Sequence, residues 1–296
     1  RDDCKAGEVP ARSRASLSRV NTTAASAPSD APLASTRIGE GPRRVAFLHG
    51  LLGRGRNFTG PAKELGDDFT VELIDLPDHG ASPWTDRVDY REIADRVAAH
   101  LRAGLAADGP VHLLGHSMGG KVAMVLALRH PDLVDRLIVE DISPRVSPQA
   151  TDEFVHLLGT MLRMDLDAYD SRAEADAAMA EHVHDARVRG FLLQNLRRTA
   201  GHFAWQPNVA MLFEHLREIG SFPDPVVPED PERVFDHPVL WLAGAESDYV
   251  QDEDVPRMKE LFPRVVRVTV RDAGHWLHAD QPEAFVSAVR TFLTAD

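Results

Sequence analysis

The sequence has a single cysteine, a shortage of basic residues relative to acidic ones, and no long apolar run. Cys4 is the only cysteine, so the chain forms no internal disulfide and needs no oxidising compartment. Lys and Arg total 33 against 46 Asp and Glu, and the formal net charge of -13 repels nucleic acid and anionic lipid. The longest apolar run, residues 122–128, is far shorter than the roughly 18–20 residues that span a bilayer. These features predict a cytoplasmic protein without nucleic-acid or membrane partners.

Signatures of metal and cofactor sites are also scarce. No cysteine cluster indicates a metal, and no glycine-rich loop of the phosphate-binding type occurs. The sequence therefore predicts no metal and no cofactor. No pattern in it points to an oligomeric state.

The first 32 residues differ in composition from the remainder of the chain. Residues 11–32 are rich in Ala, Ser and Arg and contain almost no large apolar residues, which is typical of a disordered segment. An Arg- and Ser-rich stretch of this kind is also found in targeting segments. We interpret residues 1–32 as a disordered tail.

From about residue 33, strand-like and helix-like segments alternate, which predicts a mostly parallel sheet with helices on both faces. Asp89 and Glu92 are placed as the capping box of one helix, and Pro282 is a good first residue for the last one. Between 144 and 236 the patterns are helical, without a convincing core strand, so this segment is interpreted as an insertion between residues 33–143 and 237–296. The predicted strands are 43–50, 69–76, 111–117, 136–143, 238–244 and 265–275.

Ser117 is the candidate nucleophile. It lies in the G-x-S-x-G motif of residues 115–119, directly after an apolar strand and directly before a helical pattern. A serine on such a sharp turn is forced into an unfavourable backbone conformation, and Gly115 and Gly119 leave room for neighbouring chain to pass. The motif therefore predicts an exposed hydroxyl at a helix N-terminus.

A serine hydroxyl is a poor nucleophile at neutral pH and needs a base. His275 ends the last predicted strand, follows a small Ala-Gly pair, and comes after Ser117 in the chain. His278, three residues further on, is its competitor. His49 and His116 flank glycines and are expected to serve loop geometry.

Acyl transfer also requires hydrogen-bond donors for the oxyanion, and backbone N–H groups suffice. The N–H of Met118 follows the nucleophile directly. The N–H of Leu51, in the glycine-containing loop 48–53, is the second candidate. An ordinary glycine turn is the alternative interpretation of this loop.

The motifs taken together resemble the α/β-hydrolase family over residues 33 to 296. This resemblance implies a mostly parallel central sheet flanked by helices, with residues 144–236 as an inserted helical cap. A more particular resemblance, to a subgroup of small serine esterases that includes bacterial acyl-ester hydrolases and the eukaryotic abhydrolase-11 proteins, is carried by "GRNF", "DISP", "FLLQNL" and the serine of "AESDYV". The family motifs are "FLHGLLG", "DLPDHGAS", "GHSMGGKVAM", "DISP" and "AGHWLHADQPEAF".

The third member of the catalytic triad is an acidic residue that orients the histidine. The sequence indicates this acid less clearly than it indicates the nucleophile. The commonest family pattern places it three residues after Gly244, where this chain has Ser247, and Asp248 comes one residue late. In the esterase subgroup the acid follows the preceding strand, which implies Asp141 with Ser247 as an auxiliary polar group. Asp248, Glu140 or a missing acid are the alternatives, as is a purely structural role for Asp141.

The residues and the resemblance together predict a serine hydrolase that cleaves esters, or thioesters, of short to medium acyl chains through an acyl-enzyme. A small-molecule acyl ester is the expected partner. A perhydrolase or a carbon–carbon bond hydrolase would use the same triad, and a slow-turnover ligand receptor would use the same fold.

Overall fold

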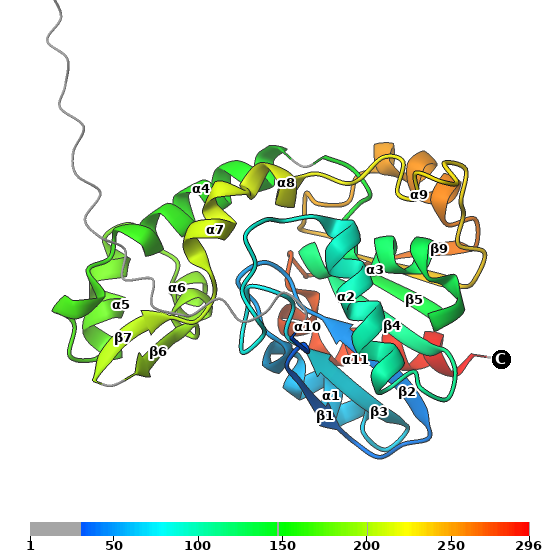
Figure 1. Ribbon diagram of the computed structural model, residues 1–296, viewed down its shortest axis with the longest axis horizontal. Helices are drawn as coiled ribbons and strands as arrows, with labels where there is room; N and C mark the ends of the chain where they lie inside the picture. Colours follow the sequence, from blue (N-terminus) through cyan, green and yellow to red (C-terminus); the bar gives the residue numbers. More distant parts are fainter. Residues whose placement is uncertain (1–30, 147, 200, 296) are drawn as a thin grey trace, which may run out of the picture.

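The computed structural model describes residues 31–146, 148–199 and 201–295, so almost all of the predicted tail lies outside the described residues. A seven-stranded sheet with the order β1-β3-β2-β4-β5-β8-β9 forms the centre of the molecule (Figure 1). Its neighbouring strands are parallel except β1 and β3, which are antiparallel. The strands are β1 Ser35–Ile38, β2 Arg43–Leu48, β3 Phe69–Ile74, β4 Val111–His116, β5 Val134–Glu140, β8 Val239–Gly244 and β9 Val265–Val270.

The six predicted strands all occur. Most of them are buried and therefore form apolar runs, whereas β9 is largely exposed. The predicted mostly parallel sheet is thereby confirmed. Strand β1 was not predicted. It has only four residues, three of them exposed, and so it lacks an apolar run.

Helices cover both faces of the sheet, and each layer has its own apolar core (Figure 1). Helices α2, α3 and α9 pack on one face, while α1 and α11 pack on the other. These helices are α1 Thr59–Leu65, α2 Tyr90–Ala103, α3 Met118–Arg129, α9 Val255–Leu261, α10 Leu277–Asp280 and α11 Pro282–Thr294, with 3₁₀ turns at Gly55–Phe58, Pro131–Leu133 and Asp252–Asp254.

The start of α2 differs in one detail from the expected capping box. Asp89 caps the helix, since its side chain accepts hydrogen bonds from the N–H groups of Arg91 and Glu92. The Glu92 carboxylate, however, pairs with Arg87. An exposed arginine thus replaces the backbone donor that the capping box would use.

The segment between β5 and β8 leaves the sheet and forms a separate group of elements, coloured green to yellow in Figure 1. Most of it is helical, as the patterns predicted, but residues 196–199 and 202–205 pair as antiparallel strands in a segment where helical patterns were expected. The domain boundaries at 144 and 236 stay a prediction. The elements are α4 Pro148–Arg163, a 3₁₀ turn at Leu166–Ala168, α5 Arg172–Ala180, α6 Ala186–Leu193, β6 Leu196–Thr199, β7 His202–Trp205, α7 Val209–Glu214 and α8 Leu216–Gly220.

None of the helices in the part of the chain that the structure describes has the length and apolar character required to cross a bilayer.

Candidate active site

The candidate residues gather at one edge of the sheet because the strands that precede them are neighbours. Strands β4, β5, β8 and β9 are adjacent and parallel, so their carboxyl ends lie along the same edge. Ser117 follows β4, Asp141 follows β5, Ser247 follows β8 and His275 follows β9. In open α/β sheets this edge is where ligands bind.

Ser117 has the strained backbone that its motif predicted. Its φ and ψ are 52° and -120°, a conformation that side chains rarely adopt. A Cβ on Gly115 would lie 2.2 Å from the Gly119 carbonyl oxygen, and one on Gly119 would lie 2.4 Å from the Leu48 carbonyl oxygen. Both positions therefore require glycine, and the turn delivers Ser117 to the N-terminus of α3.

Asp141 is the carboxylate that contacts His275. The distance from Asp141 Oδ2 to His275 Nδ1 is 2.8 Å. Since a carboxylate accepts, this contact places the proton on Nδ1 and leaves the lone pair of the imidazole on Nε2. The ring of Tyr249 stacks on His275 with centroids 3.9 Å apart, which fixes the plane of the imidazole.

The carboxylate of Asp141 is completely buried and is held by two further donors. The Gly244 N–H donates to Oδ1 at 2.9 Å, and the Ser247 hydroxyl donates to Oδ2. Three donors fix the positions of the carboxylate oxygens in this buried site. Ser247 thus occupies the place, beside Asp141, that was expected of an auxiliary polar group.

Asp248 lies apart from this group. It is exposed, and its backbone carbonyl accepts a hydrogen bond from the Gln251 side chain at 3.0 Å. The one-residue offset from Ser247 turns it toward solvent. The geometry therefore pairs His275 with Asp141 and leaves Asp248 outside the group.

Ser117 and His275 line the same cavity, which has a volume of about 390 Å³. Apolar side chains from both the sheet edge and the inserted segment form much of its wall, including Phe58, Phe191 and Trp276. Such a pocket accommodates a small apolar ligand next to a few polar groups.

Leu51 and Met118 both lie close to Ser117. Both residues line a smaller cavity with it, and neither N–H donates to a backbone or side-chain acceptor within the described ranges. The N–H of Met118 is also the first of helix α3, where the helix dipole favours negative charge. These two N–H groups are thus available to an oxyanion.

Two buried histidines fix the loop that carries Leu51. His49 Nε2 accepts from the Leu76 N–H at 2.9 Å, and His79 Nε2 accepts from the Leu52 N–H at 3.1 Å. Burial, with His79 adding to it, lowers the pKa of His49 to about 3, and burial also lowers the pKa of His79. Both rings are therefore neutral acceptors near neutral pH, in agreement with the structural role expected for His49.

Sequence reasoning missed Lys121, which lies one turn into α3 and lines the smaller cavity. Its ammonium group is buried and donates to the Gly220 and Ser221 carbonyls at 2.8 and 2.7 Å. Burial, with Arg145 nearby, lowers the pKa of Lys121 to about 7. The run "GHSMGGK" contains this lysine, but the motif assigns it no role.

The competing pair, His278 and Glu140, also forms a contact of its own. His278 Nδ1 donates to Glu140 Oε1 at 2.8 Å. His278 therefore does not share Asp141 with His275, and Glu140 does not serve His275.

The family of the chain follows from comparison with known proteins. The sequence model described as the alpha/beta hydrolase fold matches residues 43–282. The chain belongs to this hydrolase family. The hydrolase fold predicted from the sequence motifs is thereby confirmed.

Several relatives of the hydrolase are esterases or lipases. A mouse (Mus musculus) protein named sn-1-specific diacylglycerol lipase ABHD11 is 36% identical over 256 residues, which cover 84% of this chain and 80% of that protein. Esterase YbfF of Escherichia coli is 29% identical over 252 residues, covering 84% and 92%. A solved structure titled marine microorganism esterase superposes with a TM-score of 0.83 at 33% identity, covering 88% of this chain and 99% of the other. The hydrolase is accordingly an enzyme of the carboxylic ester hydrolase class.

Proposed function

We propose that the hydrolase cleaves carboxylic esters through an acyl-enzyme formed on Ser117. The Ser117 Oγ attacks the carbonyl carbon while His275 Nε2 takes its proton and then gives it to the departing alkoxide. Water, activated by the same imidazole, releases the acid and restores the serine. The observation that carries the proposal is the 2.8 Å contact between His275 and Asp141 beside the strained turn at Ser117.

Asp141 orients the imidazole and stabilises the imidazolium formed during attack. Its burial and its three donors support this role, because they hold a negative charge in one position. Ser247 assists by holding Oδ2, the oxygen that also contacts His275. The Leu51 and Met118 N–H groups hold the oxyanion, and each such donor contributes roughly 100-fold to 1000-fold in rate.

The substrate we propose is an ester of a short to medium acyl chain, with thioesters as a second class that the same steps would cleave. The apolar wall and the volume of about 390 Å³ support a small acyl ester. The mouse relative is named a diacylglycerol lipase, so longer esters belong in the substrate panel.

The test is kcat/KM on p-nitrophenyl butyrate for the wild type, Asp141→Asn and Asp248→Asn, with Ser117→Ala as the blank. We expect Asp141→Asn to lose about 10⁴-fold, because the imidazole loses its orienting anion, and Asp248→Asn to stay within about twofold.

Two outcomes would contradict this assignment. If Asp248→Asn, and not Asp141→Asn, loses most of its kcat/KM, the acid is Asp248 in the turn after β8. A wild type no faster than Ser117→Ala would remove the esterase mechanism and favour a ligand receptor on this fold.

A cytoplasmic location, and the exclusion of nucleic acid and membranes as partners, are further proposals. They are supported by the single cysteine and the net charge of -13, which disfavour an oxidising compartment and polyanions respectively. Cell fractionation with an antibody against the native chain tests the location.

A further inference from the structure

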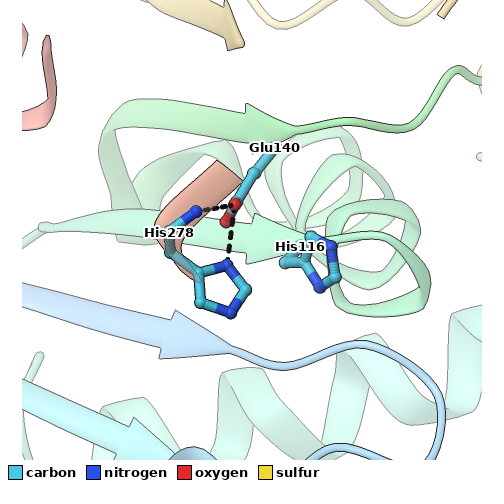
Figure 2. Close-up of side chains that lie close together, drawn as sticks. All are labelled: His116, Glu140 and His278. Carbon is cyan, nitrogen blue, oxygen red and sulfur yellow. Dashed lines mark hydrogen bonds and ion pairs between the residues drawn. The ribbon is translucent and has the colours of Figure 1, made fainter. Parts of the chain in front are cut away.

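A second group of potential ligand atoms lies beside His275 and has no part in the proposed reaction. His116 ends β4, Glu140 ends β5 and His278 lies in α10. Their side chains converge in Figure 2, and one ligand atom from each lies within 4.8 Å of the others.

Glu140 is fully buried and only partly satisfied. Its Oε1 accepts from both the N–H and the Nδ1–H of His278, at 3.1 and 2.8 Å. Its Oε2 is buried and has no hydrogen-bond partner among the described residues. A buried carboxylate oxygen without a partner is unfavourable and indicates that a water molecule or a cation binds there.

The two histidines connect this group to the substrate cavity. His116 and His278 both line it, together with Ser117 and His275. The Nε2 of His116 lies 2.8 Å from the His275 carbonyl oxygen, and because a carbonyl accepts, Nε2 carries the proton and Nδ1 the lone pair. An ion entering the cavity would therefore meet an imidazole that already has a free nitrogen.

We propose that His116, Glu140 and His278 bind a divalent transition-metal ion, with zinc as the best fit. Two imidazoles and one carboxylate form a ligand set that zinc commonly uses when a further position stays open. His116 and His278 line the cavity, from which a water molecule can take that position. Calcium and magnesium fit less well because they prefer oxygen ligands throughout. The ion replaces the Nδ1 proton that His278 donates to Glu140, and that proton leaves to solvent.

Binding at this site is inhibitory, a consequence that rests on the proposed function. His275 must acquire a positive charge when Ser117 attacks, and the His116 and His275 ring centroids are only 4.7 Å apart. A doubly charged ion held by His116 opposes that second positive charge. We therefore expect the ion to lower kcat more than it raises KM.

The first experiment is calorimetric titration of the metal-stripped chain with zinc chloride in a non-coordinating buffer. All samples carry Cys4→Ser, which removes the only thiol. We expect one ion per chain for this parent and an affinity reduced at least about tenfold in both Glu140→Gln and His278→Gln. The matched control is His202→Gln, a largely exposed histidine on β7, which should bind as the parent does. Equal affinity in all four samples, or no binding by the parent, would overturn the proposal.

Two further measurements keep the test valid if a variant folds poorly. Cobalt added to the parent should give the intense visible bands of a four- or five-coordinate ion, and a spectrum like that of free aqueous cobalt would overturn the site. Ser117→Ala should bind zinc like the parent, so that the metal site is judged separately from the esterase mechanism.

The inhibition is measured on p-nitrophenyl butyrate. Zinc should lower kcat of the parent at least about tenfold, with full recovery in EDTA, while Glu140→Gln loses less than about twofold relative to its own zinc-free rate. Equal inhibition of both would place the inhibitory ion elsewhere and overturn the proposal.

Discussion

Lys121 is a buried cation whose charge is stabilised by carbonyl oxygens. It connects α3 to the end of α8 through its contacts with the Gly220 and Ser221 carbonyls, and its ammonium lies 5.9 Å from the Tyr90 ring centroid. These contacts compensate only part of the lost hydration, since burial lowers the pKa of Lys121 from 10.5 to about 7. A group with this property makes stability depend on pH.

The sign of that dependence is determined by the two pKa values. Between about 7 and 10.5 the unfolded chain binds a proton at Lys121 that the folded chain does not, so stability rises with pH in this window. We expect the free energy of unfolding of the wild type to increase by about 2 kcal/mol relative to Lys121→Met between pH 7 and pH 9. Urea unfolding of both proteins at both pH values measures this difference. The same change in the free energy of unfolding for the wild type and Lys121→Met would contradict the prediction.

At the scale of elements, the turn from β4 into α3 determines the position of the nucleophile. The backbone carbonyls of Leu48 and Gly119 approach the two glycines of the turn so closely that no side chain fits. A larger residue at either position must move β2 away from α3 or rotate Ser117 out of the cavity.

We therefore expect Gly119→Ala to destabilise the hydrolase by at least about 2 kcal/mol and to abolish most of its activity. The matched control is Gly190→Ala in α6, where an added Cβ meets no atom within 4 Å and should stabilise by roughly 0.5–1 kcal/mol. Thermal unfolding of both variants gives the comparison. A tolerated Gly119→Ala would mean that the turn can relax.

Some of these elements could be predicted from sequence patterns and others could not. Apolar runs predicted β2, β3, β4, β5 and β8 because most residues of those strands are buried. Strand β9 was also predicted, although most of its residues are exposed. The pairing of β6 with β7 was missed because Leu196 continues the helical spacing of Leu192 and Leu193. Ser117 was predicted from spacing, while Asp141 needed the family resemblance as well. The group of His116, Glu140 and His278 was not predicted, since spacing rules detect ligands on one element and these residues come from three.

At the scale of the whole molecule, the inserted segment is fastened to the loop that carries Leu51. The Asn195 side chain is buried and donates to the Leu52 carbonyl at 2.7 Å. Asn57 donates to Gln194 at 2.9 Å beside it. The shape of the cavity therefore depends on contacts between two parts of the chain that are about 140 residues apart.

Asn195→Ala should leave the Leu52 carbonyl without its donor and make this loop more mobile. We expect the free energy of unfolding to fall by about 1–2 kcal/mol. We expect kcat/KM on p-nitrophenyl butyrate to fall roughly tenfold through misplacement of the Leu51 N–H. Thr199→Ala, at an exposed position on β6, is the control and should keep wild-type activity. An unaffected Asn195→Ala would show that the loop is positioned from the sheet side alone.

The order of the strands also affects where the acidic residue can lie as such a hydrolase evolves. Because β5 lies between β4 and β8, Asp141 and Ser247 come from neighbouring strands and meet beside the same nitrogen of His275. A lineage that acquired aspartate at position 247 would briefly carry two carboxylates sharing one proton, and could then lose either. In such a lineage the proposed acid would move from the end of β5 to the end of the adjacent β8. A search signature that demands an acidic residue at position 247 would pass over this chain.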